Sequence, residues 1–313
     1  MLEKNLNTPM GNHQMLEQFA ENLFLVYGKN QGKFPNSHSI LIQTSNSEAI
    51  LIDTGCGIDI LKNLRQEFDI VSVINSHTHP DHYAGNWLFQ DDNCSIYTPK
   101  EGFKTAGDIV ALSERFAEPG RLAESWQYFA SSMLEFKGSR PTHSYTSKSQ
   151  FDFGEVKLLP IHTPGHTIDH YCFYEPDEKI LFAFDYDLTS FGPWYGHRES
   201  NISEFKRSGK QLIELNPKML ISSHKGIVRD NIANKLEVFC RKINERDDRI
   251  LALLKEGSRT VGQLVNNAPI YRAFPYAEPL LKYWEGQMIK KHLEDLEEQE
   301  QVFQSGTEWI LQT

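Results

Sequence analysis

The sequence predicts a mixed α/β fold with many strands, followed by a helical C-terminal domain. Short runs rich in Ile, Leu and Val alternate with amphipathic helical patterns through most of the chain, and Gly, Asn and Ser separate them. Toward the C-terminus the pattern becomes long, charge-laced and helical, with no strand between two long segments. We therefore expect a polar leader over residues 1–18, an α/β domain over 19–228 and a helical domain over 229–313.

The first elements form a predicted strand meander at residues 19–28, 37–44 and 49–55. A helix should follow over 58–68, because its apolar side chains recur at helical spacing. It leads into an apolar strand at 71–75. From this point we expect strands and helices to alternate.

The middle of the chain continues this alternation. A helix is expected to start at Tyr83, a strand at 95–99, and a mostly helical insertion from about Lys100 to Arg140, interrupted at Pro119. The remaining predicted elements of this region are strands at 150–163, 170–176 and 179–185, a helix at 202–215 and a strand at 218–223.

Composition excludes several classes of function. Against 32 Lys and Arg stand 42 Asp and Glu, and the net charge of -10 opposes capture of nucleic acid or anionic lipid. No apolar run approaches the ~18 residues of a membrane span, and the polar N-terminus lacks the apolar stretch of a secretory signal. Four cysteines without a CxxC pair argue against a disulfide framework or a thiolate zinc site. We expect a cytoplasmic protein.

The C-terminal segment is expected to form helices over 234–257 and 278–299 and a two-stranded wing over 299–313. Residues 225–313 carry 13 basic and 14 acidic side chains, which is not the charge of a nucleic-acid reader. We interpret the segment as a packing or dimerisation module. We expect a small-molecule substrate as the partner and expect the chain to bind neither a membrane nor nucleic acid. Assembly into a homo-oligomer stays an open alternative.

The motif HTHPDH directly follows an apolar strand and is the strongest functional signal. In an extended chain, residues two apart point the same way, so His77 and His79 can offer two imidazoles to one metal ion. Pro80 imposes a turn that re-aims Asp81 and His82 toward a neighbouring ion. The motif therefore indicates part of a metal site.

Three further strand ends supply candidate ligands: His166 in PGHT, Asp185 closing ILFAFD and His224 after LISS. Unpaired imidazoles and carboxylates at the ends of apolar strands cost desolvation energy unless something pairs with them. An accidental histidine-rich turn accounts for one such segment but not for four. We predict one ion held by His77, His79 and His166, a second held by Asp81, His82 and His224, and Asp185 bridging the two. This donor set suits zinc, and iron or manganese would also accept it.

In this order along the chain, HTHPDH, PGHT, a strand-ending Asp and a strand-ending His resemble the metallo-beta-lactamase superfamily of hydrolases. The resemblance covers roughly residues 19–228 and implies an αββα sandwich with the metals at one edge. The helical tail resembles the winged-helix-like module of a hydrolase and endoribonuclease branch of that family.

Upstream, ILIDTG contains Asp53, for which two interpretations are equal from the residues alone. One is a turn residue in Asp-Thr-Gly. The other is a carboxylate that accepts a hydrogen bond from a metal-binding imidazole and so fixes its tautomer and aim. The family resemblance favours the supporting role.

The match departs from the family pattern at two ligands. Ala-Phe precedes Asp185 where many members have Thr-Gly, and Ser and Lys flank His224 where Gly-His-Gly is usual. These departures keep the ligands in place but make Asp187 a weak rival of Asp185. Single histidines near the motifs, at 38, 162 and 170, are not assigned as ligands.

Two ions about 3.5–4 Å apart can hold a bridging hydroxide, because coordination lowers the pKa of bound water toward ~7. We expect this hydroxide to be the nucleophile and Asp81 to be the catalytic residue that orients it or carries a proton. The chain has no GxSxG, P-loop or GxGxxG in a suitable context, which disfavours covalent hydrolases and nucleotide-binding folds.

Substrate choice is expected to lie in the helical insertion, in the loop LTSFGPWYGHRES and in the helical tail. The loop could form an aromatic wall with a polar or cationic handle, or could equally be a packed surface loop. The candidate substrate-binding residues are Phe191, Trp194, Tyr195, His197 and Arg198.

An acyl-thioester hydrolase of the glyoxalase II kind fits the full ligand set and the helical tail. A lactonase fits the metals equally well, and an endoribonuclease fits the tail but not its charge. A true beta-lactamase fits worse, because that branch generally lacks the bridging Asp and acts behind a signal peptide. From another class, a diiron redox protein of this fold usually has a carboxylate where this chain has His79 and His82.

Overall fold

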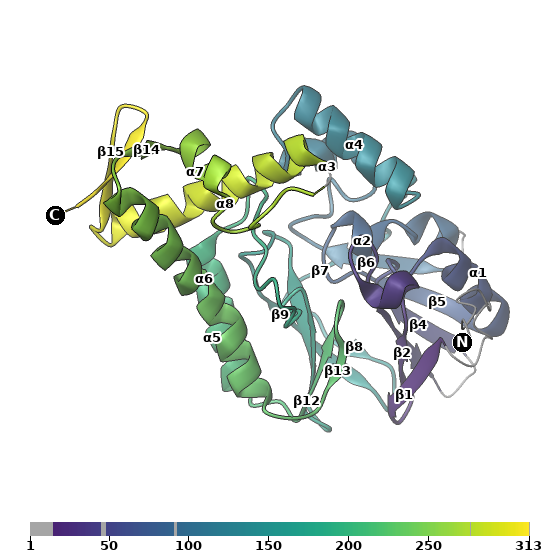
Figure 1. Cartoon of the computed structure of the whole chain (residues 1–313). Helices are drawn as coiled ribbons and strands as arrows, with labels where there is room; N and C mark the ends of the chain where they lie inside the picture. The colour runs from purple at the N-terminus through teal and green to yellow at the C-terminus, as the bar shows by residue number, and fades with distance from the viewer. Residues whose placement is uncertain (1–14, 45–47, 91–92, 276, 313) are drawn as a thin grey trace, which may run out of the picture.

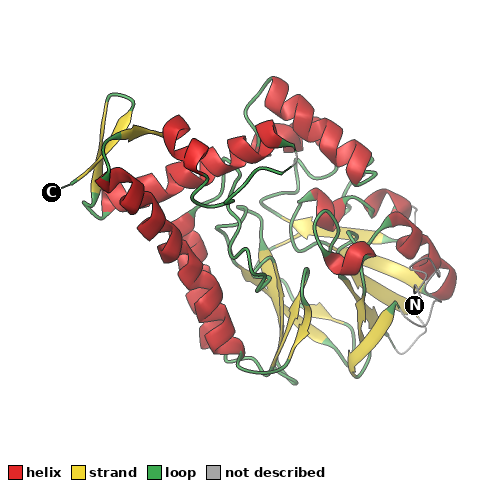
Figure 2. Cartoon of the chain, in the orientation of Figure 1, coloured by secondary structure: helices red, strands yellow, loops and turns green. Residues whose placement is uncertain are grey.

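The fold is a four-layer αββα sandwich with a helical C-terminal region, seen in a computed structural model that describes residues 15–44, 48–90, 93–275 and 277–312 (Figures 1 and 2). Most of the predicted polar leader, residues 1–14, lies outside the described residues. No helix in the described ranges is both long enough and apolar enough to cross a membrane.

The first sheet has seven strands in chain order. Its first four strands pair antiparallel, and the pairs from β4 to β7 are parallel. The strands are β1 (Leu16–Ala20), β2 (Leu23–Val26), β3 (Ser39–Gln43), β4 (Glu48–Ile52), β5 (Asp69–Ile74), β6 (Ser95–Pro99) and β7 (His143–Tyr145). Helix α1 (Ile58–Glu67) joins β4 to β5, as parallel pairing requires a crossover.

The second sheet has six strands in the order β13-β12-β11-β10-β9-β8. Only β11 and β12 pair in parallel, with α5 (Ile202–Glu214) between them in the chain. The strands are β8 (Phe151–Asp152), β9 (Lys157–His162), β10 (Tyr171–Glu175), β11 (Ile180–Phe184), β12 (Met219–Ser222) and β13 (Gly226–Val228).

Side-chain alternation along β4 shows how the layers form. Ile50 and Ile52 belong to the core between the sheets, which also contains Phe182 of β11. Leu51 points to the opposite face and joins a separate core with Leu61 of α1. On the far side, α5 covers the outer face of the second sheet. The predicted αββα fold is therefore confirmed.

The predicted helical insertion contains α3 (Ile109–Phe116) and α4 (Arg121–Met133), which follow β6 in the chain. Asp108 caps α3 by accepting from the N–H groups of Val110 and Ala111. Two short 3-10 helices lie earlier in the chain: η2 (Lys29–Gly32) precedes β3, and η3 (Asn86–Phe89) precedes β6.

The C-terminal region contains three helices and a small wing. The helices are α6 (Ile232–Lys255), α7 (Val261–Asn267) and α8 (Glu278–Glu298), and the wing strands are β14 (Arg259–Thr260), β15 (Val302–Ser305) and β16 (Glu308–Leu311). Helix α6 packs on α5 through a shared core that includes Phe205 and Phe239. The N-terminal half of α8 reaches α4 (Figure 1), and Trp284 and Trp126 belong to one apolar cluster there.

Several predicted elements differ in the structure. The strand expected at 19–28 is the β1–β2 hairpin, because Asn22 takes a positive φ of 60° and turns the chain. The strand expected at 150–163 is likewise the hairpin β8–β9, turning at Gly154. The helix expected to start at Tyr83 is instead α2 (Pro80–Tyr83), which begins at the proline, as the first position of a helix allows. The expected two-stranded wing has a third strand, β14, and the short β7, β13 and α7 were not predicted.

Candidate metal centre

The predicted ligands lie at one edge of the sandwich, where strands end. His77 and His79 follow β5, Asp185 follows β11 and His224 follows β12. Because β4 and β5 are parallel, Asp53, after β4, lies at the same edge as the HTHPDH segment. These segments are far apart in sequence, and only the sheet topology brings them together.

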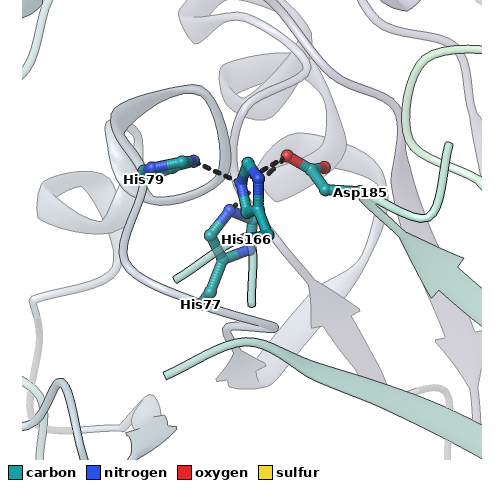
Figure 3. A group of neighbouring side chains, drawn as sticks. All are labelled: His77, His79, His166 and Asp185. Atoms are coloured by element: carbon teal, nitrogen blue, oxygen red, sulfur yellow. Dashed lines mark hydrogen bonds and ion pairs between the residues drawn. The ribbon is translucent and has the colours of Figure 1, made fainter. Parts of the chain in front are cut away.

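Seven side chains form two adjoining groups whose ligand atoms lie within 4.8 Å of one another in each group. Figure 3 shows the members of the first group facing one another. The first group is His77, His79, His166 and Asp185, and the second is Asp81, His82 and His224. All seven predicted ligands therefore lie near one another, with Asp185 in the first group.

Asp185 lies between the two groups. Its Oδ2 atom is 2.9 Å from His166 Nε2 and 3.7 Å from His77 Nε2. Its Oδ1 atom is 3.0 Å from His82 Nε2 and 3.7 Å from His224 Nε2. One carboxylate thus contacts both groups, each with a different oxygen, which is one of the arrangements open to a bridging ligand.

The residues present fit a pair of metal ions. His77 Nε2 and His82 Nε2 are buried ring nitrogens that make no well-aligned hydrogen bond within the described residues. Two other ring nitrogens, His79 Nδ1 and His166 Nε2, face each other at 2.8 Å. Buried ring nitrogens that converge with so few well-aligned hydrogen bonds carry a desolvation cost that a bound cation would remove.

Metal binding requires neutral imidazole and ionised carboxylate, and the pKa shifts of His77, His79 and Asp185 favour these forms. Burial lowers the pKa of His77 and of His79 well below the usual range. Burial alone would raise the pKa of Asp185, but the imidazoles of His82 and His166 hold it well below the ordinary value. At His82, burial alone would lower the pKa, but the carboxylates of Asp185 and Asp53 raise it well above the usual value. The centre therefore attracts positive charge.

Hydrogen bonds from outside the groups fix the orientation of the imidazoles. Asp53 Oδ2 lies 2.7 Å from His82 Nδ1, and Asp53 also accepts from the N–H and hydroxyl of Ser76. The carbonyl of Trp194 accepts from His166 Nδ1 at 2.8 Å, and that of Gly32 accepts from His224 Nδ1 at 2.7 Å. Each contact leaves Nε2 of that ring directed at the centre.

Backbone geometry explains the DTG and PGH segments. Asp53 has a positive φ of 60°, a strained conformation for a residue that is not glycine. A Cβ atom at Gly55 would lie 1.4 Å from the carbonyl oxygen of Asp81, so only glycine allows the two turns to meet. Gly165 combines a φ of 128° with close approach to the backbone of Phe205.

A buried ionic cluster that no sequence motif indicated lies beneath the HTHPDH turn. Arg115 of α3 donates to Asp169 and, through two nitrogens, to Glu199. Arg115 also donates to the hydroxyl of Thr78, which itself donates to Asp169 at 2.6 Å. Because Thr78 lies between His77 and His79, the cluster holds the turn that presents both imidazoles. The only sequence feature near this cluster is the TIDH segment next to PGHT, which contains Asp169.

A cavity of about 410 Å³ opens onto both groups. Its floor includes His79, Asp81, His166, Asp185 and His224. Its walls are mainly apolar and come from α4, α8 and the loop after β11; they include Trp126, Phe129, Leu134, Phe191, Trp194, Leu280, Leu281 and Trp284.

The structure places three of the five predicted substrate residues, Phe191, Trp194 and His197, at this cavity. The other two lie away from the lining of this cavity. Tyr195 is fully buried, and its hydroxyl contacts His292 of α8, because neighbouring residues of an extended loop point in opposite directions. Arg198 lines a separate polar hollow and donates to the carbonyl of Glu114.

The residues left unassigned lie outside both groups. His38 accepts from the N–H of Gly28, His162 contacts the carbonyl of Ile168, and His170 accepts from the N–H of Asp185. Asp187 lines the cavity but belongs to neither group, and burial raises its pKa to about 6. Asp185 is therefore the carboxylate that joins the groups.

Comparison with known proteins is consistent with this geometry. The family profile described as "Metallo-beta-lactamase superfamily" matches residues 32–224. The Lactamase-like protein aptB of Emericella nidulans is 27% identical over 257 residues, which cover 80% of this chain and 70% of that protein. The human Acyl-coenzyme A thioesterase MBLAC2 is 26% identical over 204 residues, 58% of this chain and 68% of that protein.

A solved structure has the same fold. The crystal structure of a metallo-beta-lactamase family protein from Thermus thermophilus superposes with a TM-score of 0.73 at 21% identity. The superposition covers 93% of this chain and 99% of that structure, so the C-terminal region is included.

Proposed function

The chain belongs to the metallo-beta-lactamase superfamily and is a metal-dependent hydrolase, and we propose that it hydrolyses acyl thioesters whose acyl group is apolar. The proposal assigns His77, His79 and His166 to one ion, Asp81, His82 and His224 to the other, and Asp185 to both. We propose zinc as the metal, because mixed imidazole and carboxylate ligands suit it.

The observation that carries the substrate proposal is the continuity between the ligand groups and the apolar cavity. A thioester carbonyl at the floor would leave its acyl chain against Trp126, Leu281 and Trp284. Burial of apolar surface contributes about 0.8 kcal/mol per CH₂ group. The cavity therefore favours an apolar acyl group over a polar one. Among named relatives, the human protein is an acyl-coenzyme A thioesterase, which agrees with this chemistry.

Two divalent ions would supply Lewis acidity and a water of lowered pKa, the usual source of the nucleophile at such centres. The chain's own contribution is alignment. Asp53, Trp194 and Gly32 orient three of the imidazoles, and the ionic cluster at Arg115 holds the turn that carries two more.

Asp81 is the proposed proton carrier. It lines the cavity, and its Oδ2 atom lies 3.7 Å from His224 Nε2 and 3.9 Å from His82 Nε2. This position would let the carboxylate orient the nucleophile or carry a proton as the intermediate breaks down. A thiolate leaves readily near neutral pH because thiol pKa values lie near 8.5, so the leaving group needs little further acid assistance.

The other hypotheses fit the cavity less well. An endoribonuclease needs cations for the phosphate backbone, and Lys33 is the single Lys or Arg among the described residues that line the cavity. A diiron redox centre of this fold would have a carboxylate where the groups contain His79 and His82. A lactonase remains a distinct outcome of the experiment below.

We also propose a hydrolase domain over residues 19–228 and a helical domain over 229–313. The end of β13 at Val228 and the start of α6 at Ile232 support this division.

The test is a substrate panel on metal-depleted protein and on the same protein reloaded with zinc. Release of free thiol from acetyl-, octanoyl- and benzoyl-coenzyme A is compared with the opening of an acyl-homoserine lactone and the cleavage of single-stranded RNA. We expect metal-dependent thiol release that is faster with the two larger acyl groups. Lactone or RNA turnover by the two-metal protein without thiol release would refute the proposal.

A further inference from the structure

The loop that follows β11 connects the cavity to the metal centre. The side chain of Trp194 lines the cavity, while its main-chain carbonyl accepts from His166 Nδ1 at 2.8 Å. A shift of this carbonyl would change both the tautomer and the aim of the His166 ring. Any side chain that holds this loop in place therefore also affects the orientation of His166, a ligand in the first group.

Arg246 of α6 lies inside this loop. Its guanidinium donates to the carbonyls of Phe191, at 2.7 Å, and Pro193, and to the hydroxyl of Tyr195 at 2.8 Å. It also lies over the rings of Phe191 and Tyr195, at 4.8 Å and 5.3 Å from their centroids. The residues on both sides of Trp194 are thus fixed by one side chain from the helical region.

The burial of Arg246 is costly unless these contacts compensate for it. The residue is 1% exposed, and within the described part of the chain it has no carboxylate oxygen within 4.0 Å. A buried guanidinium loses its hydration and needs polar partners at every donor direction. Here the partners are main-chain carbonyls of the loop, so the cation and the loop conformation depend on each other.

Two further contacts tie the same loop to α8. Tyr195 contacts Nε2 of His292 at 2.7 Å, and His292 Nδ1 lies 2.6 Å from Asp247. The indole of Trp194 donates to the hydroxyl of Tyr271 at 2.7 Å. The N–H group of Tyr271 in turn donates to Glu285 of α8.

We propose that Arg246 is a positioning residue for the metal centre. By holding the carbonyls of Phe191 and Pro193 and the hydroxyl of Tyr195, it sets the conformation around Trp194 and so the orientation of His166, and thereby the affinity of the ion held by His77, His79 and His166. The helical region is then a working part of the active site as well as a packing module. The inference rests on the proposed two-metal centre.

Zinc affinity is the direct readout, measured by competition with a chromophoric chelator. For Arg246→Met we expect one of the two ions to bind roughly 10- to 100-fold more weakly, the usual effect of losing support to a ligand. The other ion should be unaffected, because Asp53 and Gly32 support the second group. The zinc affinity of Arg246→Lys should lie between those of the wild type and Arg246→Met, because one ammonium group cannot reproduce the planar guanidinium that bonds two carbonyls.

The matched control is Ile250→Ala, one turn further along α6. Ile250 is fully buried in the same core but has no part in the loop contacts, so its loss destabilises the helices without releasing Trp194. It should lower the melting temperature and leave both zinc affinities unchanged. If Arg246→Met does not fold, Tyr195→Phe removes only the shared hydroxyl and should weaken the same ion roughly two- to tenfold.

The outcomes separate the two proposals. Wild-type protein that binds no zinc would overturn the metal centre and this inference with it. Wild-type protein that binds two ions, with both affinities retained in Arg246→Met or, failing its folding, in Tyr195→Phe, would overturn this inference alone. Selective loss at one ion, absent in Ile250→Ala, would support it.

Discussion

The carboxylate of Asp53 lies 2.7 Å from Nδ1 of His82, and both residues are fully buried. The same carboxylate accepts from the N–H and hydroxyl of Ser76, the residue before His77. One acidic side chain therefore orients a ligand of the second group and anchors the start of the HTHPDH segment. Its positive φ is the strained backbone feature that places it there.

Asp53→Asn should weaken zinc binding roughly 10- to 100-fold at the ion held with His82. The amide can still accept from Ser76 but has only one acceptor oxygen, so the contact with His82 Nδ1 loses its partner. Chelator competition measures the loss. Asp59→Asn, at an exposed position of α1 where Asp59 pairs with Lys29, is the control and should bind zinc as the wild type does.

Arg115→Met should lower the free energy of unfolding by about 3–5 kcal/mol, because it leaves the carboxylates of Asp169 and Glu199 buried without their cation. Urea denaturation of the metal-free protein measures this change. Arg121→Met at the exposed start of α4 should change stability little. A small effect at Arg115 would mean that the cluster does not hold the turn.

Leu281→Trp should narrow the acyl cavity. Leu281 lines its wall, and a larger side chain there removes room for an extended chain. We expect kcat/KM for octanoyl-coenzyme A to fall about tenfold relative to that for acetyl-coenzyme A, in line with the cost of methylenes that no longer fit. Val238→Trp, on the exposed face of α6, is the control. Equal losses for both substrates would place the acyl group elsewhere.

His292 predicts a pH dependence of stability. Burial lowers its pKa below the usual value, although Asp247 partly opposes this. The unfolded chain therefore takes up a proton near pH 6.5 that the folded chain does not, and the free energy of unfolding falls as the pH drops below this value. His292→Gln should reduce that slope by at most about 1.4 kcal/mol per pH unit. Denaturation of both proteins between pH 7.5 and 5.5, under one metal condition, measures the difference.

The sequence revealed the ligand groups better than their surroundings. His166, Asp185 and His224 each follow an apolar strand, and that local pattern sufficed to predict which side chains would converge. Arg115 and Asp169 carry no such pattern, because their pairing depends on how α3 packs beneath a distant turn. Local spacing alone could not identify it.

The loop after β11 shows a second limit. Its aromatic composition fitted a cavity wall and a packed surface loop equally, and composition does not say which face of the loop each side chain takes. Trp194 faces the cavity and Tyr195 faces α8, and the deciding contact is Arg246, about fifty residues further along the chain. Each of the hairpins β1–β2 and β8–β9 reads as a single strand in the sequence, because turns of two and four residues interrupt an apolar pattern only briefly.

The most direct test of the central claim is a crystal structure of the zinc-loaded protein with anomalous scattering recorded on both sides of the zinc edge. The account predicts two anomalous peaks, one among His77, His79 and His166 and one among Asp81, His82 and His224, with Asp185 contacting both. Peaks absent from these positions, or zinc held only by residues outside the two groups, would contradict it.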